Sequence, residues 1–183
     1  KFEIEEIDTE IFKQLKIDEL LKFKDILKQI TAKNEVNFNS KKFSRSFFNK
    51  LNLQFDMAYG KLNYSKKLLI SDNVFQCKGN INLLEEFPLL FFDCSINSVS
   101  KRNLFKKLNI NIEKVNENFI LNTNGHLNIL NQKINFQEIS LDKSYKASNE
   151  DLIYFKKKFE NILFNEDFVR IFNLNKIKEF ILE

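Results

Sequence analysis

The chain has no tryptophan, one proline, one histidine and three glycines among its 183 residues. With so few glycines it holds no phosphate-binding loop, and the GxSxG and HExxH motifs of hydrolases and zinc peptidases are also missing. His126 has no second histidine to complete a set of nucleophile, base and orienting residue. The sequence therefore predicts no catalytic residue, no metal site and no cofactor, and we expect a protein that is not an enzyme.

The sequence also lacks a segment rich in proline, glycine or serine that would separate two domains. We therefore expect a single domain over residues 1–183, with a lead-in at 1–49, a sheet at 50–142 and helices at 143–183. No apolar run approaches the length of about 18 residues that a membrane-spanning helix needs. Because the apolar pattern is still running at Ile181, we expect the chain to be a fragment of a longer protein.

Positive and negative charges are nearly balanced, with 29 Lys and Arg against 25 Asp and Glu and a net charge of +4. They are interspersed along the whole chain, which is typical of a solvated surface and not of a nucleic-acid-binding face. Residues 40–50, SKKFSRSFFNK, are basic, and here we expect the long basic side chains to lie around buried phenylalanines. The charge pattern predicts no nucleic-acid partner.

The chain is rich in phenylalanine, with 21 residues, and its main pattern is a hairpin signature in residues 119–142. There, apolar and polar residues alternate as in a strand with one buried face. Asn131-Gln132 predicts a two-residue turn between the two strands. This turn sets the pairing of the apolar residues: Ile129 faces Ile134, and Leu127 faces Phe136. Both strands then turn their apolar residues to the same side, so pattern and register agree.

The second strand of this hairpin changes its apolar parity beyond Phe136, where the next apolar residue is Ile139. Such a change requires one extra residue near Gln137 or Glu138. Gly125 lies on the facing strand, and glycine in a strand often marks a bulge. The sequence therefore predicts a β-bulge at this point and a long, bent hairpin.

Apolar residues at every second position predict further strands at 34–39, 51–64, 68–70, 75–83, 90–96 and 110–112. After Gly60 the apolar parity changes again, which predicts a second bulge. Helical spacing predicts helices within 9–30 and 148–183, the latter opening on a capping box at Ser148, and a short helix capped by Ser100. We therefore expect an α+β fold: a twisted, mostly antiparallel, groove-like sheet with helices at both ends.

The two cysteines have no CxxC spacing, so they do not indicate a zinc site. A turn near Glu85-Glu86 places Cys77 opposite Cys94 and Ile81 opposite Leu90. As cross-strand neighbours, the cysteines either form a disulfide in an oxidising compartment or remain two small buried thiols. The sequence leaves these two states open.

Several predicted strands point large apolar side chains to one shared face. We expect these residues to line an apolar groove: Phe75, Ile81, Leu90, Phe92, Leu127, Ile129, Ile134 and Phe136. Each such side chain is worth roughly 1.5–3 kcal/mol when fully buried, so something apolar must cover the face. Acyl chains of a lipid and the chain's own terminal helices are the two alternatives.

Two segments resemble the AsmA-like family of Gram-negative envelope proteins, which includes YhdP and TamB relatives. They are CKGNINLLEEFPLLFFDCSI at residues 77–96 and NGHLNILNQKINFQEISLD at residues 124–142. Both match the family's alternating apolar strand pairs, the second one near the family's C-terminal end. The resemblance covers about residues 50–183, and residues 1–49 are only compatible with it.

The resemblance implies a module of a curled sheet that is anchored in the inner membrane, faces the periplasm and carries phospholipid between the inner and outer membranes. Its implied partners are phospholipid acyl chains and, through a segment outside this chain, the membrane. The residues also allow a non-enzymatic scaffolding or assembly domain that docks an envelope protein partner through its apolar face. A closed lipocalin-like carrier or an RNA-binding β domain is a weaker alternative.

Overall fold

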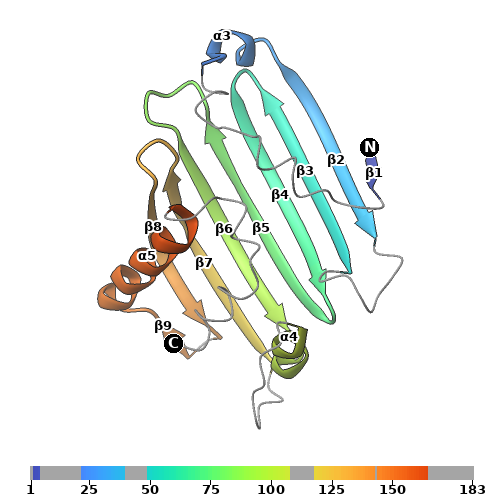
Figure 1. The fold of residues 1–183 in the computed structure, drawn as a ribbon, viewed down its shortest axis with the longest axis vertical. Helices are drawn as coiled ribbons and strands as arrows, with labels where there is room; N and C mark the ends of the chain where they lie inside the picture. Colours follow the sequence, from blue (N-terminus) through green and yellow to red (C-terminus); the bar gives the residue numbers. More distant parts are fainter. Residues whose placement is uncertain (1, 5–21, 40–48, 108–117, 143, 165–183) are drawn as a thin grey trace.

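A computed structural model describes residues 2–4, 22–39, 49–107, 118–142 and 144–164. Its strands are β1 (Phe2–Ile4), β2 (Thr31–Asn39), β3 (Lys50–Ala58), β4 (Lys61–Ile70), β5 (Asn73–Asn82), β6 (Leu89–Ser98), β7 (Phe119–Asn128), β8 (Lys133–Leu141) and β9 (Tyr145–Lys146). Its helices are α3 (Lys24–Leu27), α4 (Lys101–Lys107) and α5 (Asn149–Phe164). The strands form one open sheet in sequence order, as Figure 1 shows.

The sheet is antiparallel from β2 to β9, and only the short β1 pairs in parallel, with β2. Short connections favour antiparallel pairing of β3 with β4, β4 with β5, β5 with β6 and β7 with β8, since a parallel pair needs a long crossover connection. The predicted α+β class with a mostly antiparallel sheet is confirmed. Some predicted elements lie outside the described residues. They are the strand at 110–112, residues 9–21 of the first predicted helical region and residues 165–183 of the last one.

The register gives the sheet two chemically different faces, because directly paired residues point to the same side. One central row runs Val36, Leu53, Lys66, Cys77, Cys94, Thr123 and Ile139. Beside it runs a row of Asn34, Phe55, Tyr64, Gly79, Phe92, Gly125 and Phe136. We call the side that carries these two rows the apolar face, and the opposite side the polar face.

The predicted bulge after Gly60 is wrong, because the chain turns back at this point. Tyr59 and Gly60 have φ values of 50° and 77°, and Ala58 pairs directly with Lys61. Positive φ at both central residues is the requirement of the type I′ turn that suits a two-residue hairpin. The change of apolar parity therefore separates two strands, β3 and β4, instead of bending one.

The hairpin of β7 and β8 forms, but its predicted register is wrong by two residues. Asn128 pairs with Lys133, and Leu127 pairs with Ile134, so the turn has four residues. The Asn128 Oδ1 atom accepts a hydrogen bond from the Asn131 backbone N–H at 2.9 Å, which starts the turn earlier than expected. Because a shift of two residues preserves the side-chain period, the apolar residues that remain within β7 and β8 keep their predicted face.

The predicted bulge in β8 is confirmed. Gly125 pairs with Phe136 while its neighbour Asn124 pairs with Glu138, which leaves Gln137 as the extra residue. This insertion returns Ile139 to the apolar face after Phe136, as the parity change required.

The start of α5 has the predicted capping box. The Ser148 Oγ atom accepts a hydrogen bond from the Asp151 N–H at 3.2 Å, and the Asp151 carboxylate accepts one from the Ser148 N–H at 2.9 Å. The hydrogen bonds that the Asp151 carboxylate accepts from the Ser148 N–H, the Ser148 hydroxyl and the Tyr145 hydroxyl lower the pKa of Asp151. The stabilisation they provide is therefore present above the pKa that Asp151 has in the unfolded chain, and is lost as the pH falls through its folded value.

The most deeply buried residues lie toward the margins of the sheet. Leu27 of α3 and Leu104 of α4 are both 6% exposed. Beside α4, Asn73 and Ser98 are fully buried, and the Ser98 hydroxyl donates a hydrogen bond to the Asn73 Oδ1 atom at 2.6 Å. Figure 1 shows the three described helices at the margins, with none crossing the middle of β3, β4 or β5.

Candidate functional site

Seven of the eight residues predicted to line a groove lie in strands and point to the apolar face: Phe75, Ile81, Leu90, Phe92, Leu127, Ile134 and Phe136. Ile129 lies in the turn between β7 and β8, so its predicted place beside Ile134 is wrong. The physical reason is the early turn that Asn128 begins.

Burial varies across this set. Ile81 is 3% exposed and Ile134 is 6% exposed, so both belong to the core. The other five are half-buried, and so are Leu53 and Phe55 in β3. The apolar face therefore keeps accessible apolar surface near its centre, where a fully closed core would have none.

Helix α5 covers one margin of the apolar face. It packs chiefly on β8, where the ring of Phe159 lies edge-on to the ring of Phe136 with centroids 5.3 Å apart. Phe136 in turn lies edge-on to Phe92, at 5.9 Å. The Glu160 carboxylate accepts a hydrogen bond from the backbone N–H of Ile134, which satisfies a donor at the exposed edge of the sheet. The part of the face that α5 covers is thus the part nearest β8.

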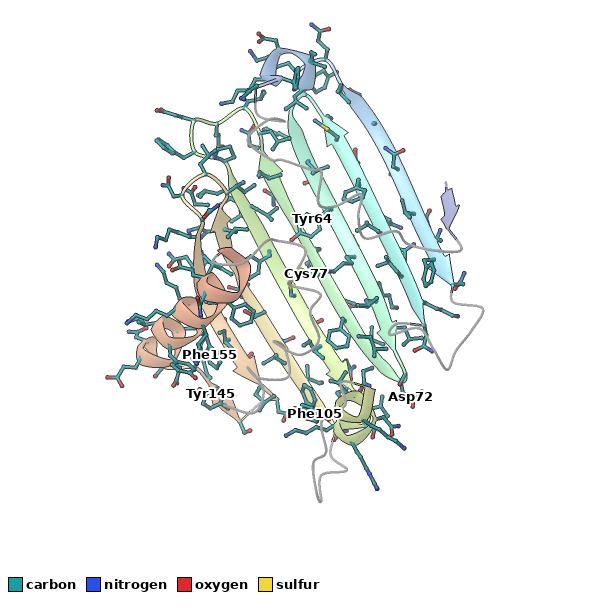
Figure 2. The ribbon with its side chains drawn as sticks, viewed as in Figure 1. Tyr64, Asp72, Cys77, Phe105, Tyr145 and Phe155 are labelled. Atoms are coloured by element: carbon teal, nitrogen blue, oxygen red, sulfur yellow. A yellow bond between two sulfur atoms is a disulfide. The ribbon has the colours of Figure 1, made fainter. Side chains whose placement is uncertain are left out.

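A disulfide at the centre of the apolar face joins the neighbouring strands β5 and β6. Cys77 and Cys94 are direct cross-strand partners with Cα atoms 4.0 Å apart, and the structure joins their sulfur atoms. The predicted pairing is confirmed, and the structure has the bonded state of the two that the sequence left open. Figure 2 shows Cys77 near the middle of the sheet, beside Tyr64 on the neighbouring strand.

Reducing this disulfide is expected to lower the free energy of unfolding by about 3 kcal/mol, because the bond closes a short loop in the unfolded chain. The two cysteines are 17 positions apart. Urea unfolding with and without reductant measures the change. A double variant, Cys77→Ser with Cys94→Ser, is the control. Its free energy of unfolding should equal that of the reduced protein and should not change when reductant is added. An unchanged unfolding midpoint after complete reduction would contradict the prediction.

Lys66 and Tyr64 are among the polar side chains of the apolar face, and the sequence analysis did not single them out. Lys66 lies in the central row between Leu53 and Cys77, and Tyr64 precedes it on the same face. Burial lowers the pKa of Lys66 and raises the pKa of Tyr64. The predicted strand ended at Tyr64, but extending it by two residues would have identified Lys66. Leu62, Tyr64 and Lys66 are at every second position, so their side chains point to the same face of the strand.

Side-chain hydrogen bonds connect polar residues within β2 and between β2 and β3 on the polar face. The Glu35 carboxylate accepts bonds of 2.9 Å from the side-chain amides of Asn37 and Asn52. Shallow hollows of about 550 and 420 Å³ lie over β2 to β4 and over β3 to β7 on this side. His126 is also here, with its ring 5.8 Å from the ring of Phe91. The arrangement is that of a hydrated surface, without a grouping of metal ligands among the described residues.

Comparisons with protein-family models, curated proteins and solved structures find no match to this chain. The resemblance to AsmA-like proteins therefore stays a prediction. Among the residues that the structure describes, no helix is long and apolar enough to span a membrane.

Proposed function

We propose that this chain binds the acyl chains of lipids on its apolar face, as a module of a longer AsmA-like protein that carries phospholipid between the inner and outer membranes. The observation that carries the proposal is the half-burial of large apolar residues at the centre of one sheet face, such as Phe55, Phe75 and Phe92. Covering them with a ligand recovers about 25 cal/mol for each Å² of apolar surface removed from water.

Acyl chains suit this face because it is extended and has few hydrogen-bonding side chains. Neighbouring strands lie about 4.8 Å apart, so the face presents parallel rows of apolar groups along which a flexible chain can lie. A ligand rich in polar atoms would lose hydrogen bonds to water there without replacing them. The surface thus favours a long hydrocarbon over a polar solute.

The disulfide supports the proposed location of the site in the periplasm. Disulfides persist in oxidising compartments, including the bacterial periplasm, and are rare in the cytosol. A periplasm-facing module of a protein anchored in the inner membrane would meet this condition at Cys77 and Cys94.

A second candidate function is the docking of an envelope protein partner through the same face. The specific observation in its favour is α5, which shows that an amphipathic helix packs on this surface through the Phe136 and Phe159 rings. A partner helix would then occupy the centre of the face as α5 occupies its margin.

The test uses a photoreactive phospholipid and mass spectrometry of lipid that co-purifies with the chain. The variant Phe55→Asn with Phe75→Asn removes two half-buried rings of the apolar face that lie away from α5. The matched control is Phe91→Asn, at a ring on the polar face that is 42% exposed. We expect the double variant to lose most of the crosslinking and the control to keep it, with both folded by circular dichroism. Crosslinking of the folded double variant at the wild-type level would refute the proposal.

A further inference from the structure

Lys66 is a charged residue on the apolar face of the sheet. In the described strands β2 to β8 it is the one charged side chain on the apolar face, since the other lysines of these strands point to the polar face. No aspartate or glutamate of these strands shares its face. Its direct cross-strand neighbours are Leu53 and Cys77.

A lysine on the polar face has a different environment. Lys78 lies opposite Asp93, with its Nζ atom 3.3 Å from a carboxylate oxygen. Among the described residues, no carboxylate lies within ion-pair distance of Lys66. Its side chain reaches solvent, yet the apolar groups around it disfavour the ammonium and lower its pKa. An anion bound beside Lys66 would offset that cost.

Tyr64 provides a second donor at the same place. It lies two residues before Lys66 on β4, so the two Cα atoms are about 6.6 Å apart and both side chains rise from the same face. The Tyr64 hydroxyl has a weak contact with the Cys77 Sγ atom at 3.8 Å. A phenol O–H and an ammonium in this arrangement can donate to the two oxygens of one small anion.

We propose that Lys66 and Tyr64 bind the carboxylate of a long-chain fatty acid whose tail lies on the apolar face. The inference rests on the proposed function, because the tail takes the place of the acyl chain described above. A carboxylate fits better than a phospholipid head group, since Lys66 has apolar neighbours on both sides and a large head would bury further polar groups without partners. One cation also matches the single charge of a fatty acid.

The experiment compares palmitate with hexadecanol, which has the same tail length and no charge, by calorimetric titration below their aggregation limits. Wild type is expected to bind palmitate about tenfold more tightly, the effect of one charge-assisted hydrogen bond. Lys66→Met should abolish that preference while hexadecanol binding stays, and Lys66→Arg should largely restore it. Tyr64→Phe should reduce the preference by a smaller factor.

The matched control is Lys67→Met, because Lys67 follows Lys66 in the chain but points to the polar face, opposite Asn52 and Gln76. It should keep the wild-type preference for palmitate. If folded Lys66→Met keeps the preference too, or if wild type binds hexadecanol as tightly as palmitate, the carboxylate site is refuted and the acyl-binding function stands. If wild type binds neither ligand and no phospholipid, both proposals fail.

Discussion

Replacing Phe136 with alanine is expected to lower the free energy of unfolding by about 3 kcal/mol, the lower end of the range for a phenylalanine removed from a core. Phe136 is half-buried, and its ring lies between those of Phe92 and Phe159, with centroids 5.9 and 5.3 Å away. Its loss removes the ring contact between Phe136 of β8 and Phe159 of α5. Urea unfolding followed by circular dichroism measures the change.

The same variant should also expose α5 locally. Limited proteolysis is expected to cut within residues 149–164 faster than in wild type, because a helix without its packing contact opens more often. Phe91→Ala is the control, since this ring lies on the polar face and is 42% exposed, and its loss should cost about 1 kcal/mol or less. If Phe136→Ala were no more destabilising than Phe91→Ala, the docking of α5 through Phe136 would be wrong.

Replacing Gly79 with valine should have an effect of similar size, about 3 kcal/mol, through overpacking. Gly79 lies on the apolar face opposite Tyr64 and Phe92. A Cβ atom built here would overlap the backbone carbonyl oxygen of Phe91 and lie 2.7 Å from the Tyr64 ring. The carbonyl belongs to a central strand and cannot move without disturbing the pairing of β5 with β6. Thermal unfolding measures the loss as a lower melting temperature.

Asn80→Val is the matched control for this prediction. Asn80 is the next residue of β5, it is exposed, and it points to the polar face opposite Asn63 and Phe91. A surface substitution of this kind should change stability by about 0.5 kcal/mol or less. Equal melting temperatures for the two variants would show that β5 and β6 do not approach as closely at Gly79 as the structure has them.

Some features of the fold could be predicted from the sequence, because they depend on short-range patterns of residues. The bulge at Gln137 follows from a change of apolar parity across Gly125, and the pairing of Cys77 with Cys94 follows from one turn and a period of two. The capping box needs only Ser148 and Asp151, three positions apart. Each of these features depends on residues that are close in sequence or related by a single turn.

Two predictions were wrong, the bulge after Gly60 and the register of the β7–β8 hairpin. They have a common physical cause, because the conformation of a turn depends on backbone torsions and single hydrogen bonds. At Gly60 a parity change has the same appearance in a bulge and in a hairpin, and only the positive φ of Tyr59 and Gly60 distinguishes them. At Asn131 the expected turn competes with one that the Asn128 side chain begins. Apolar alternation contains no information about either choice.

The sequence by itself determined that β3 and β5 to β8 each have one apolar side, because side-chain direction in a strand alternates with a period of two. Residues 65–67 fell between two predicted strands, so only the structure showed that Lys66 lies in β4 and points to the same side. Only the tertiary structure decided how much of that face is covered. Packing of Phe159 on Phe136 places α5 over β8, while Phe55 and Phe75 stay half-buried. How much of the apolar face is buried depends on where a helix distant in sequence packs. The alternation of apolar residues within a strand is the same whether its apolar side contacts a helix, a lipid or water.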